Sequence, residues 1–171
     1  MGRRTPYIID VTGECNDKII VNKYDVTPCE KGKAMRLDQR LVDAAIAFAN
    51  RRFPTTDEEG AAALYTANGE ILTSTAIAVL NDQVALCHEV GAMCEAYAKN
   101  LKITATACVH RDKAGRFIIL AACGVCQERL WYWGGEVEVA VPHEDDPTKW
   151  RAVTLKEMNP YYWRKPFMKR K

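Results

Sequence analysis

Apolar residues recur at helical spacing in the first well-patterned part of the chain. Leucine, alanine and phenylalanine at positions 37, 41, 44, 45, 48 and 49 fall on one side, which predicts an amphipathic helix over residues 36–52. Pro54 follows where prolines commonly stand past a helix end. Before this helix, the runs YIIDV and KIIVNKYDV have strand-like composition but carry no chemical motif. We therefore expect an N-terminal extension of unknown role, residues 1–36, and a domain over residues 37–171.

Short strand and helix patterns alternate through the rest of the chain. Asn68-Gly69 between two apolar runs predicts a β-hairpin. Strands are predicted at 103–110, 116–123, 136–141 and 151–155, and helices at 87–99, at 123–133 and from Thr154, where Glu157 completes a capping box. The buried face of the helix at 87–99 is predicted to hold Val90, Met93, Cys94 and Tyr97. This order indicates an α/β fold with a mixed sheet covered by helices on both faces.

Composition and charge narrow the class of protein only a little. The 171 residues carry a formal net charge of +2, which gives no strong global field toward nucleic acid or membrane. Basic residues gather at the two ends, where solvated tails are the expected interpretation. No apolar run has the length of a signal peptide or a membrane span. We expect a cytoplasmic protein whose seven cysteines are reduced thiols or metal ligands.

Two short segments carry candidate chemistry. In the first, Cys87 stands two residues before Glu89; in the second, Cys123 and Cys126 form a Cys-x-x-Cys pair. Such a pair can place two thiolates on one tetrahedral ion, and a third ligand leaves a position for water, as in catalytic zinc sites. A carboxylate beside that water can act as a general base and acid. Taken alone, the pair is also compatible with a redox motif, a structural zinc half-site or two buried thiols.

The same residues resemble the signature of the cytidine deaminase superfamily. C-H-E followed by A-C-G-V-C is similar to the family's C-x-E and P-C-x-x-C motifs. ANGEILT resembles its first hairpin and TLKEMNPYYW its C-terminal segment, so the likeness covers residues 37–165. The layout is nearest to blasticidin S deaminase. The resemblance implies a three-layer α-β-α fold with a mixed five-stranded sheet, and a homotetramer whose pockets are shared between subunits.

The resemblance also implies a metal centre and a reaction. Cys87, Cys123 and Cys126 match the three Zn²⁺ ligands of the small members, and Glu89 matches the proton shuttle. In the family, zinc hydroxide attacks C4 of a cytosine ring, which becomes uracil as ammonia leaves. Gln127-Glu128 stands in place of the family's Arg-Gln, so Arg129 and Arg116 are candidates to offset the thiolate charge.

Substrate contacts follow from the same resemblance. The backbone N–H of His88 is expected to hold O2 of the base, and the Ala122 carbonyl to meet the leaving amino group. Ala122 replaces the usual proline, and the bulk of His88, which replaces a small residue, is expected to narrow or reshape the pocket. Tyr162 and Trp163 stand where the family closes its pocket with aromatic residues, with plain packing as the alternative.

The largest departure from the family concerns the sugar. Nucleoside deaminases carry N-V-E-N on the second strand, whereas this chain has Ala76-Ile77-Ala78-Val79, which cannot bind hydroxyl groups through side chains. We expect a substrate that is a small cytosine-containing molecule: a nucleoside, a modified nucleoside or a nucleoside antibiotic. The alternatives are a deaminase of bases in nucleic acid, against which the near-neutral charge argues, and a non-catalytic zinc-stabilised binding domain.

Overall fold

The computed structural model describes residues 35–54 and 58–168, so the strands suggested near the N-terminus lie outside the described residues. The helices are α1 Gln39–Arg52, α2 Val90–Ala98, α3 Gly124–Leu130 and α4 Leu155–Met158. Three short 3₁₀ turns are η1 Asp82–Val84, η2 Trp131–Trp133 and η3 Lys165–Phe167. The strands are β1 Gly60–Thr66, β2 Ile71–Ser74, β3 Ile103–Arg111, β4 Phe117–Leu120, β5 Glu138–Pro142 and β6 Trp150–Thr154.

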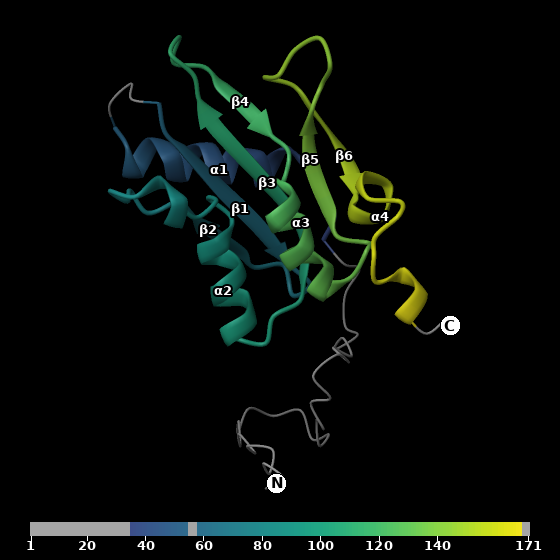
Figure 1. Ribbon diagram of the computed structural model, residues 1–171. Coiled ribbons are helices and arrows are strands. Elements are labelled where there is room, and N and C mark those ends of the chain that lie inside the picture. Colours follow the sequence, from purple (N-terminus) through teal and green to yellow (C-terminus); the bar gives the residue numbers. More distant parts are fainter. Residues whose placement is uncertain (1–34, 55–57, 169–171) are drawn as a thin grey trace, which may run out of the picture.

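The strands form one mixed sheet in the order β2-β1-β3-β5-β6, with β4 also paired to β3 (Figure 1). β3 pairs in parallel with β5 near Ala105 and antiparallel with β4 from Cys108 onward, so two strands share one edge of β3. The sheet therefore has six strands, as the hairpin and the four further strand patterns predict, where the family resemblance implied five. The mixed character, and each strand predicted within the described residues, are confirmed.

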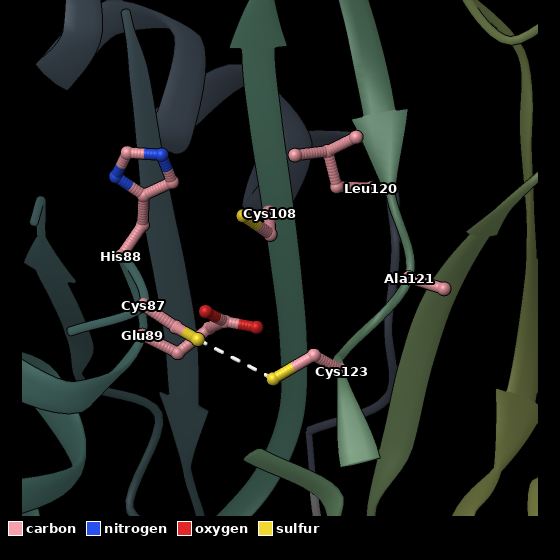
Figure 2. A pocket seen from close by; sticks show the side chains of 7 residues that line it. All are labelled: Cys87, His88, Glu89, Cys108, Leu120, Ala121 and Cys123. Atoms are coloured by element: carbon pink, nitrogen blue, oxygen red, sulfur yellow. Dashed lines mark hydrogen bonds between the residues drawn. The ribbon is translucent and has the colours of Figure 1, made fainter. Parts of the chain in front are cut away.

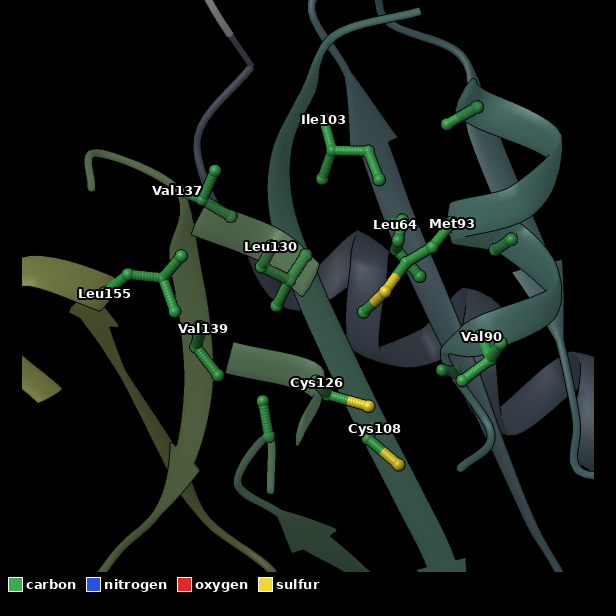
Figure 3. Close-up of a cluster of buried hydrophobic side chains, with 14 of the residues drawn as sticks. Leu64, Val90, Met93, Ile103, Cys108, Cys126, Leu130, Val137, Val139 and Leu155 are labelled. Atoms are coloured by element: carbon green, nitrogen blue, oxygen red, sulfur yellow. The ribbon is translucent and has the colours of Figure 1, made fainter. Parts of the chain in front are cut away.

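Helices cover both faces of the sheet, which confirms the three-layer prediction. β1 is buried along its whole length, and its alternating side chains enter two different cores. Ala63 and Tyr65 pack in the cluster beneath α1, whereas Ala62 and Leu64 pack in the cluster beneath α2 and α3 (Figure 3). No helix within the described ranges is both long and apolar enough to cross a membrane.

The helices follow from local sequence, with one correction. Asp38 caps α1 by accepting a hydrogen bond from the Leu41 amide at 3.1 Å. The helix therefore begins at Gln39, three residues after the predicted start at residue 36. In α2 the prediction that Cys94 and Tyr97 are buried was wrong, because both are exposed. The buried face consists of Val90, Ala92, Met93 and Ala96. Helical spacing determines which residues share a face, but packing against the sheet determines which of those faces is buried.

Candidate active site

The three predicted cysteine ligands converge although they come from two separate segments. Cys87 precedes α2, Cys123 is the N-cap of α3, and Cys126 lies in the first turn of α3. Their sulfur atoms all lie within 4.8 Å of one another, and Sγ of Cys87 and Sγ of Cys123 are 3.3 Å apart (Figure 2). A tetrahedral ion with Zn–S bonds near 2.3 Å has its sulfurs roughly 3.8 Å apart. The three thiols can therefore hold one metal ion of this kind.

The thiols differ in how readily they ionise. Burial and the nearby Glu89 carboxylate raise the pKa of Cys126, and burial also raises the pKa of Cys87. At Cys123 burial acts in the same direction, but hydrogen bonds from the backbone N–H groups of Cys126 and Val125 and from thiol neighbours outweigh it and lower the pKa. The start of α3 thus favours one thiolate, whereas the other two would be stabilised by a bound cation.

Glu89 is the buried carboxyl of the site. Glu89 is only 3% exposed to solvent. Its side chain lies beside Cys87 and Cys123, with the carboxyl group toward Cys108 (Figure 2). Burial raises its pKa, and hydrogen bonding and the charge of Arg129 offset this only in part. A carboxyl with a raised pKa is suited to take up and release protons near neutral pH.

Cys87, Cys123 and Glu89 line a hollow of about 240 Å³. Its walls are Cys87, His88, Glu89, Cys108, Leu120, Ala121 and Cys123. Sequence reasoning did not identify Cys108, Leu120 and Ala121 as site residues. Cys108 and Leu120 are cross-strand partners in the β3–β4 pair, so one register brings both to the same face of the sheet. The sequence predicts strand β3 but not its partners, and only the pairing with β4 shows that the face with Cys108 holds the site.

The His88 side chain points away from the sulfur atoms and forms part of the wall (Figure 2). Its Nδ1 accepts a hydrogen bond from the Ala76 amide at 3.0 Å and lies 3.2 Å from the Thr75 hydroxyl. Ser74 Oγ donates to the His88 carbonyl at 2.5 Å. The residues that follow β2 are thus tied to the turn that carries Cys87 and Glu89.

Positions 76–79 do not lie on the second strand, which corrects the sequence interpretation. β2 ends at Ser74, and Ile77 and Ala78 in the segment that follows are exposed. The Ala76 backbone, rather than any side chain of this stretch, reaches the site through His88. The sequence alone could not reveal this link, because His88 is twelve residues farther along the chain.

The remaining predicted substrate residues lie at the edge of the site or beyond it. Ala122 is buried, and its carbonyl accepts a hydrogen bond from Gln127 Nε2 at 2.8 Å. Tyr162 stacks on Trp131 with ring centroids 4.1 Å apart and donates to Glu128 at 3.1 Å. Trp163 is exposed and also donates to Glu128. Neither Tyr162 nor Trp163 is among the described residues that line the hollow.

The two candidate arginines occupy different surroundings. Arg116 is paired with Asp112 across the β3–β4 turn, at 2.8 Å. Arg129 acts electrostatically on Glu89 and lowers its pKa against the effect of burial. Arg129 is therefore the candidate of the two whose charge reaches the site.

Comparison with models of known protein families gives no match, and comparison with curated protein sequences gives none either. Solved structures do match. The cytidine deaminase from Bacillus anthracis is 36% identical, with a TM-score of 0.67, and the match covers 75% of this chain and 91% of that one. The cytidine deaminase from Burkholderia pseudomallei matches at 21% identity and a TM-score of 0.57, over 74% and 98% of the two chains. The cytidine deaminase from Mycobacterium leprae matches at 22% identity and a TM-score of 0.55, over 71% of this chain and 96% of that one.

The three-layer fold, with three thiols converging beside a buried glutamate, defines a deaminase-type α/β protein. The chain belongs to the cytidine deaminase superfamily, as shown by the similarity to the Bacillus anthracis structure. The two more distant structures support the fold.

Proposed function

We propose that the protein is a zinc-dependent hydrolytic deaminase of a cytosine ring in a small molecule. The observation that carries this proposal is the convergence of three thiols beside one buried carboxyl, at a hollow that Cys87, Cys123 and Glu89 line. A structural metal site has no use for a buried carboxyl beside it, whereas deamination needs a group that moves protons. The similarity to cytidine deaminases supports the same chemistry.

In this proposal Cys87, Cys123 and Cys126 hold the ion and leave one position open. Zinc bound by three protein ligands supplies Lewis-acid activation of a water molecule. Thiolates suit Zn²⁺, and burial of Cys126 keeps that side of the cluster closed to solvent.

Glu89 is proposed to move the protons of the reaction. Its carboxylate accepts a proton from the attacking water as the water oxygen bonds to C4, and passes that proton to N3 of the ring. It then takes the proton of the new C4 hydroxyl group, which becomes a carbonyl, and delivers it to the departing amino group. One water is consumed, the C4–N bond breaks and ammonia leaves. The His88 backbone N–H is proposed to hold O2 of the base and the Ala122 carbonyl to orient the amino group. Gln127 donates to that carbonyl and fixes its direction.

Tyr162 and Trp163 are proposed to close a pocket on a neighbouring copy, since within their own chain they pack against α3 through Glu128. This assumes the homotetramer implied by the family. Exposed apolar side chains at Ile77, Leu80 and Val84 support burial between copies. The cytoplasmic location and the separate N-terminal extension, residues 1–36, belong to the same proposal. Light scattering on the full chain tests the tetramer.

The decisive experiment measures zinc and turnover on the same preparation. Metal content is quantified, and ammonia release and ultraviolet absorbance are followed with cytosine, cytidine, deoxycytidine, blasticidin S and a short cytosine-containing single strand. One zinc per chain, with ammonia from a small substrate that is lost in Glu89→Ala, is the expected result.

Other outcomes point elsewhere. Turnover of the single strand alone would indicate a nucleic-acid deaminase. Zinc without turnover of any substrate would indicate a binding domain. A full chain that binds no zinc would contradict the three-cysteine centre.

A further inference from the structure

His88 is held in one orientation by two segments, the stretch after β2 and strand β1. The Ala76 amide donates to Nδ1, and because the Thr75 hydroxyl donates to the Gly60 carbonyl at 2.6 Å, the amide is the donor that Nδ1 accepts. A neutral imidazole whose Nδ1 is an acceptor carries its proton on Nε2. Behind the ring, β1 comes so close that a Cβ on Gly60 would lie 2.5 Å from Nε2. The ring therefore cannot retreat from the hollow toward β1.

The two ends of the hollow have different chemistry. Cys87, Glu89 and Cys123 gather at one end, whereas the His88 ring and Leu120 flank the other (Figure 2). Besides Glu89, His88 is the only lining residue among the described ones whose side chain carries nitrogen or oxygen. The end away from the thiols is thus walled by the His88 ring, whose Nε2 packs against Gly60 of β1, and by Leu120, Ala121 and Cys108.

The six-membered ring of the substrate connects these two ends. If C4 faces the thiols and Glu89, then N1, on the opposite side of the ring, faces His88 and Leu120. In a nucleoside N1 bears the ribose, whose hydroxyl groups need hydrogen-bonding partners when they are buried. Within one copy of the chain, neither the described lining residues, apart from Glu89 and His88, nor the neighbouring Ala76-Ile77-Ala78-Val79 provide such side chains.

We propose that His88 is a positioning and specificity-determining residue, whose fixed ring restricts the pocket to compact cytosine derivatives: the free base, or a base with a small N1 substituent. The inference rests on the deaminase function proposed above and names its substrate class. The same ring ties Thr75 and Ala76 to the turn that bears Cys87 and Glu89. Loss of the ring therefore has two separable consequences, a wider pocket and a less well-ordered turn.

Two substitutions separate these consequences. In His88→Asn the amide oxygen occupies nearly the place of Nδ1 and can still accept from Ala76, while the outer part of the ring is removed. In His88→Ala both the acceptor and the bulk are lost. His143→Asn is the matched control, because His143 is exposed on the loop between β5 and β6, away from the hollow.

The experiment measures kcat and KM of the zinc-loaded full chain for cytosine, 1-methylcytosine, deoxycytidine and cytidine. We expect the natural chain to prefer cytosine over cytidine by about tenfold or more in kcat/KM, the scale on which pocket shape discriminates. Both His88 variants should shift that ratio toward cytidine by about tenfold, mainly through KM. The fall in kcat should be smaller in His88→Asn than in His88→Ala, and His143→Asn should leave the ratio unchanged.

Calorimetric titration of cytosine and of cytidine into zinc-loaded Glu89→Gln measures the binding affinity of each. The ratio of the two affinities tests the preference independently of turnover. Circular dichroism melting establishes that each variant is folded. A natural chain that prefers cytidine, or a ratio that neither His88 variant moves, would overturn the inference while leaving the deaminase proposal intact. Absence of ammonia from every substrate would instead overturn the deaminase proposal and, with it, this inference.

Discussion

The two faces of the sheet are covered in different ways. On one face α1 has 14 residues and packs on an apolar cluster that includes Tyr65, and the buried Glu138 and Arg111 are bonded to residues at its two ends. On the other face α2 has nine residues and α3 has seven, and both begin at the residues that carry the chemistry. The cluster beneath them includes Cys126 and abuts the buried Glu89. Buried polar groups thus occur on both faces, but on the α1 face they anchor the two ends of the helix, whereas on the other face Glu89 lies beside three thiols.

The sharpest test of this contrast is Glu89→Gln, on the site-bearing face. We expect kcat to fall by about 10²–10⁴-fold, the usual contribution of a positioned proton carrier. Glutamine keeps the shape of the side chain and removes a carboxyl whose ionisation is opposed by burial, so the melting temperature should stay the same or rise. Steady-state kinetics and thermal melting measure the two effects. Activity above a tenth of the original would exclude Glu89 as the proton carrier.

Leu41→Ala is the opposite experiment, on the α1 face. Leu41 is fully buried beneath α1, so truncation should lower the free energy of unfolding by about 2–5 kcal/mol. Zinc content and kcat per folded molecule should not change, because Leu41 packs in the cluster on the other face of the sheet and does not line the hollow. Denaturant titration and kinetics on the same sample test both statements.

Leu130→Ala provides the matched comparison. Leu130 is equally buried but lies on α3, one turn after Cys126. A similar loss of stability is expected, together with weaker zinc retention in a chelator titration, because the turn that holds Cys126 loses its packing. If Leu41→Ala loses zinc as readily as Leu130→Ala, the prediction that zinc retention depends only on packing on the α3 face is wrong.

Gly60→Ala probes the point where the sheet touches the site. The added Cβ would lie 2.5 Å from His88 Nε2 and 2.7 Å from the Val109 carbonyl oxygen, so the histidine ring or the β1–β3 pair must shift. Overpacking of this kind costs about 1–3 kcal/mol. Gly124→Ala is the control, because a Cβ there meets nothing within 4 Å. An unfolding free energy equal in both variants would show that Gly60 is not tightly packed.

Local patterns predicted most of the elements, because their causes are local. The Asn68-Gly69 turn, the spacing of apolar residues in α1 and the Thr154–Glu157 capping box each depend on residues within one element, and each is present. The metal cluster was also accessible, since Cys-x-x-Cys and the Cys87–Glu89 spacing are each confined to one turn. The sequence alone could only propose that these two turns meet.

What the sequence did not reveal depends on contacts between distant segments. The sharing of one β3 edge by β4 and β5 brings Leu120 beside Cys108. The exposure of Tyr97 depends on which side of α2 meets the sheet. His88 received a backbone role from family resemblance, while the bond from its ring to Ala76 appears only when both turns are in place.

The smallest expected effect concerns α4, whose Leu155 packs into the site-bearing core. Glu157 accepts hydrogen bonds from the Thr154 hydroxyl at 2.5 Å and the Thr154 amide at 2.8 Å, and these lower its pKa from the ordinary 4.5. Because the folded-state pKa is depressed, this contribution to stability is present above the pKa of the unfolded chain and is lost as pH falls through the folded-state value.

Glu157→Gln should therefore lower the melting temperature slightly at pH 7, and the difference from the natural chain should shrink as pH falls below about 4.5, since only the charged acceptor gives the stronger bond. Glu144→Gln, on the exposed loop after β5, is the surface control. Melting curves of all three proteins between pH 7 and pH 4 provide the measurement. A difference that grows toward low pH would mean that Glu157 stabilises α4 by something other than its charge. On the α1 face the N-cap is Asp38, which accepts the Leu41 amide without a reciprocal partner three residues later.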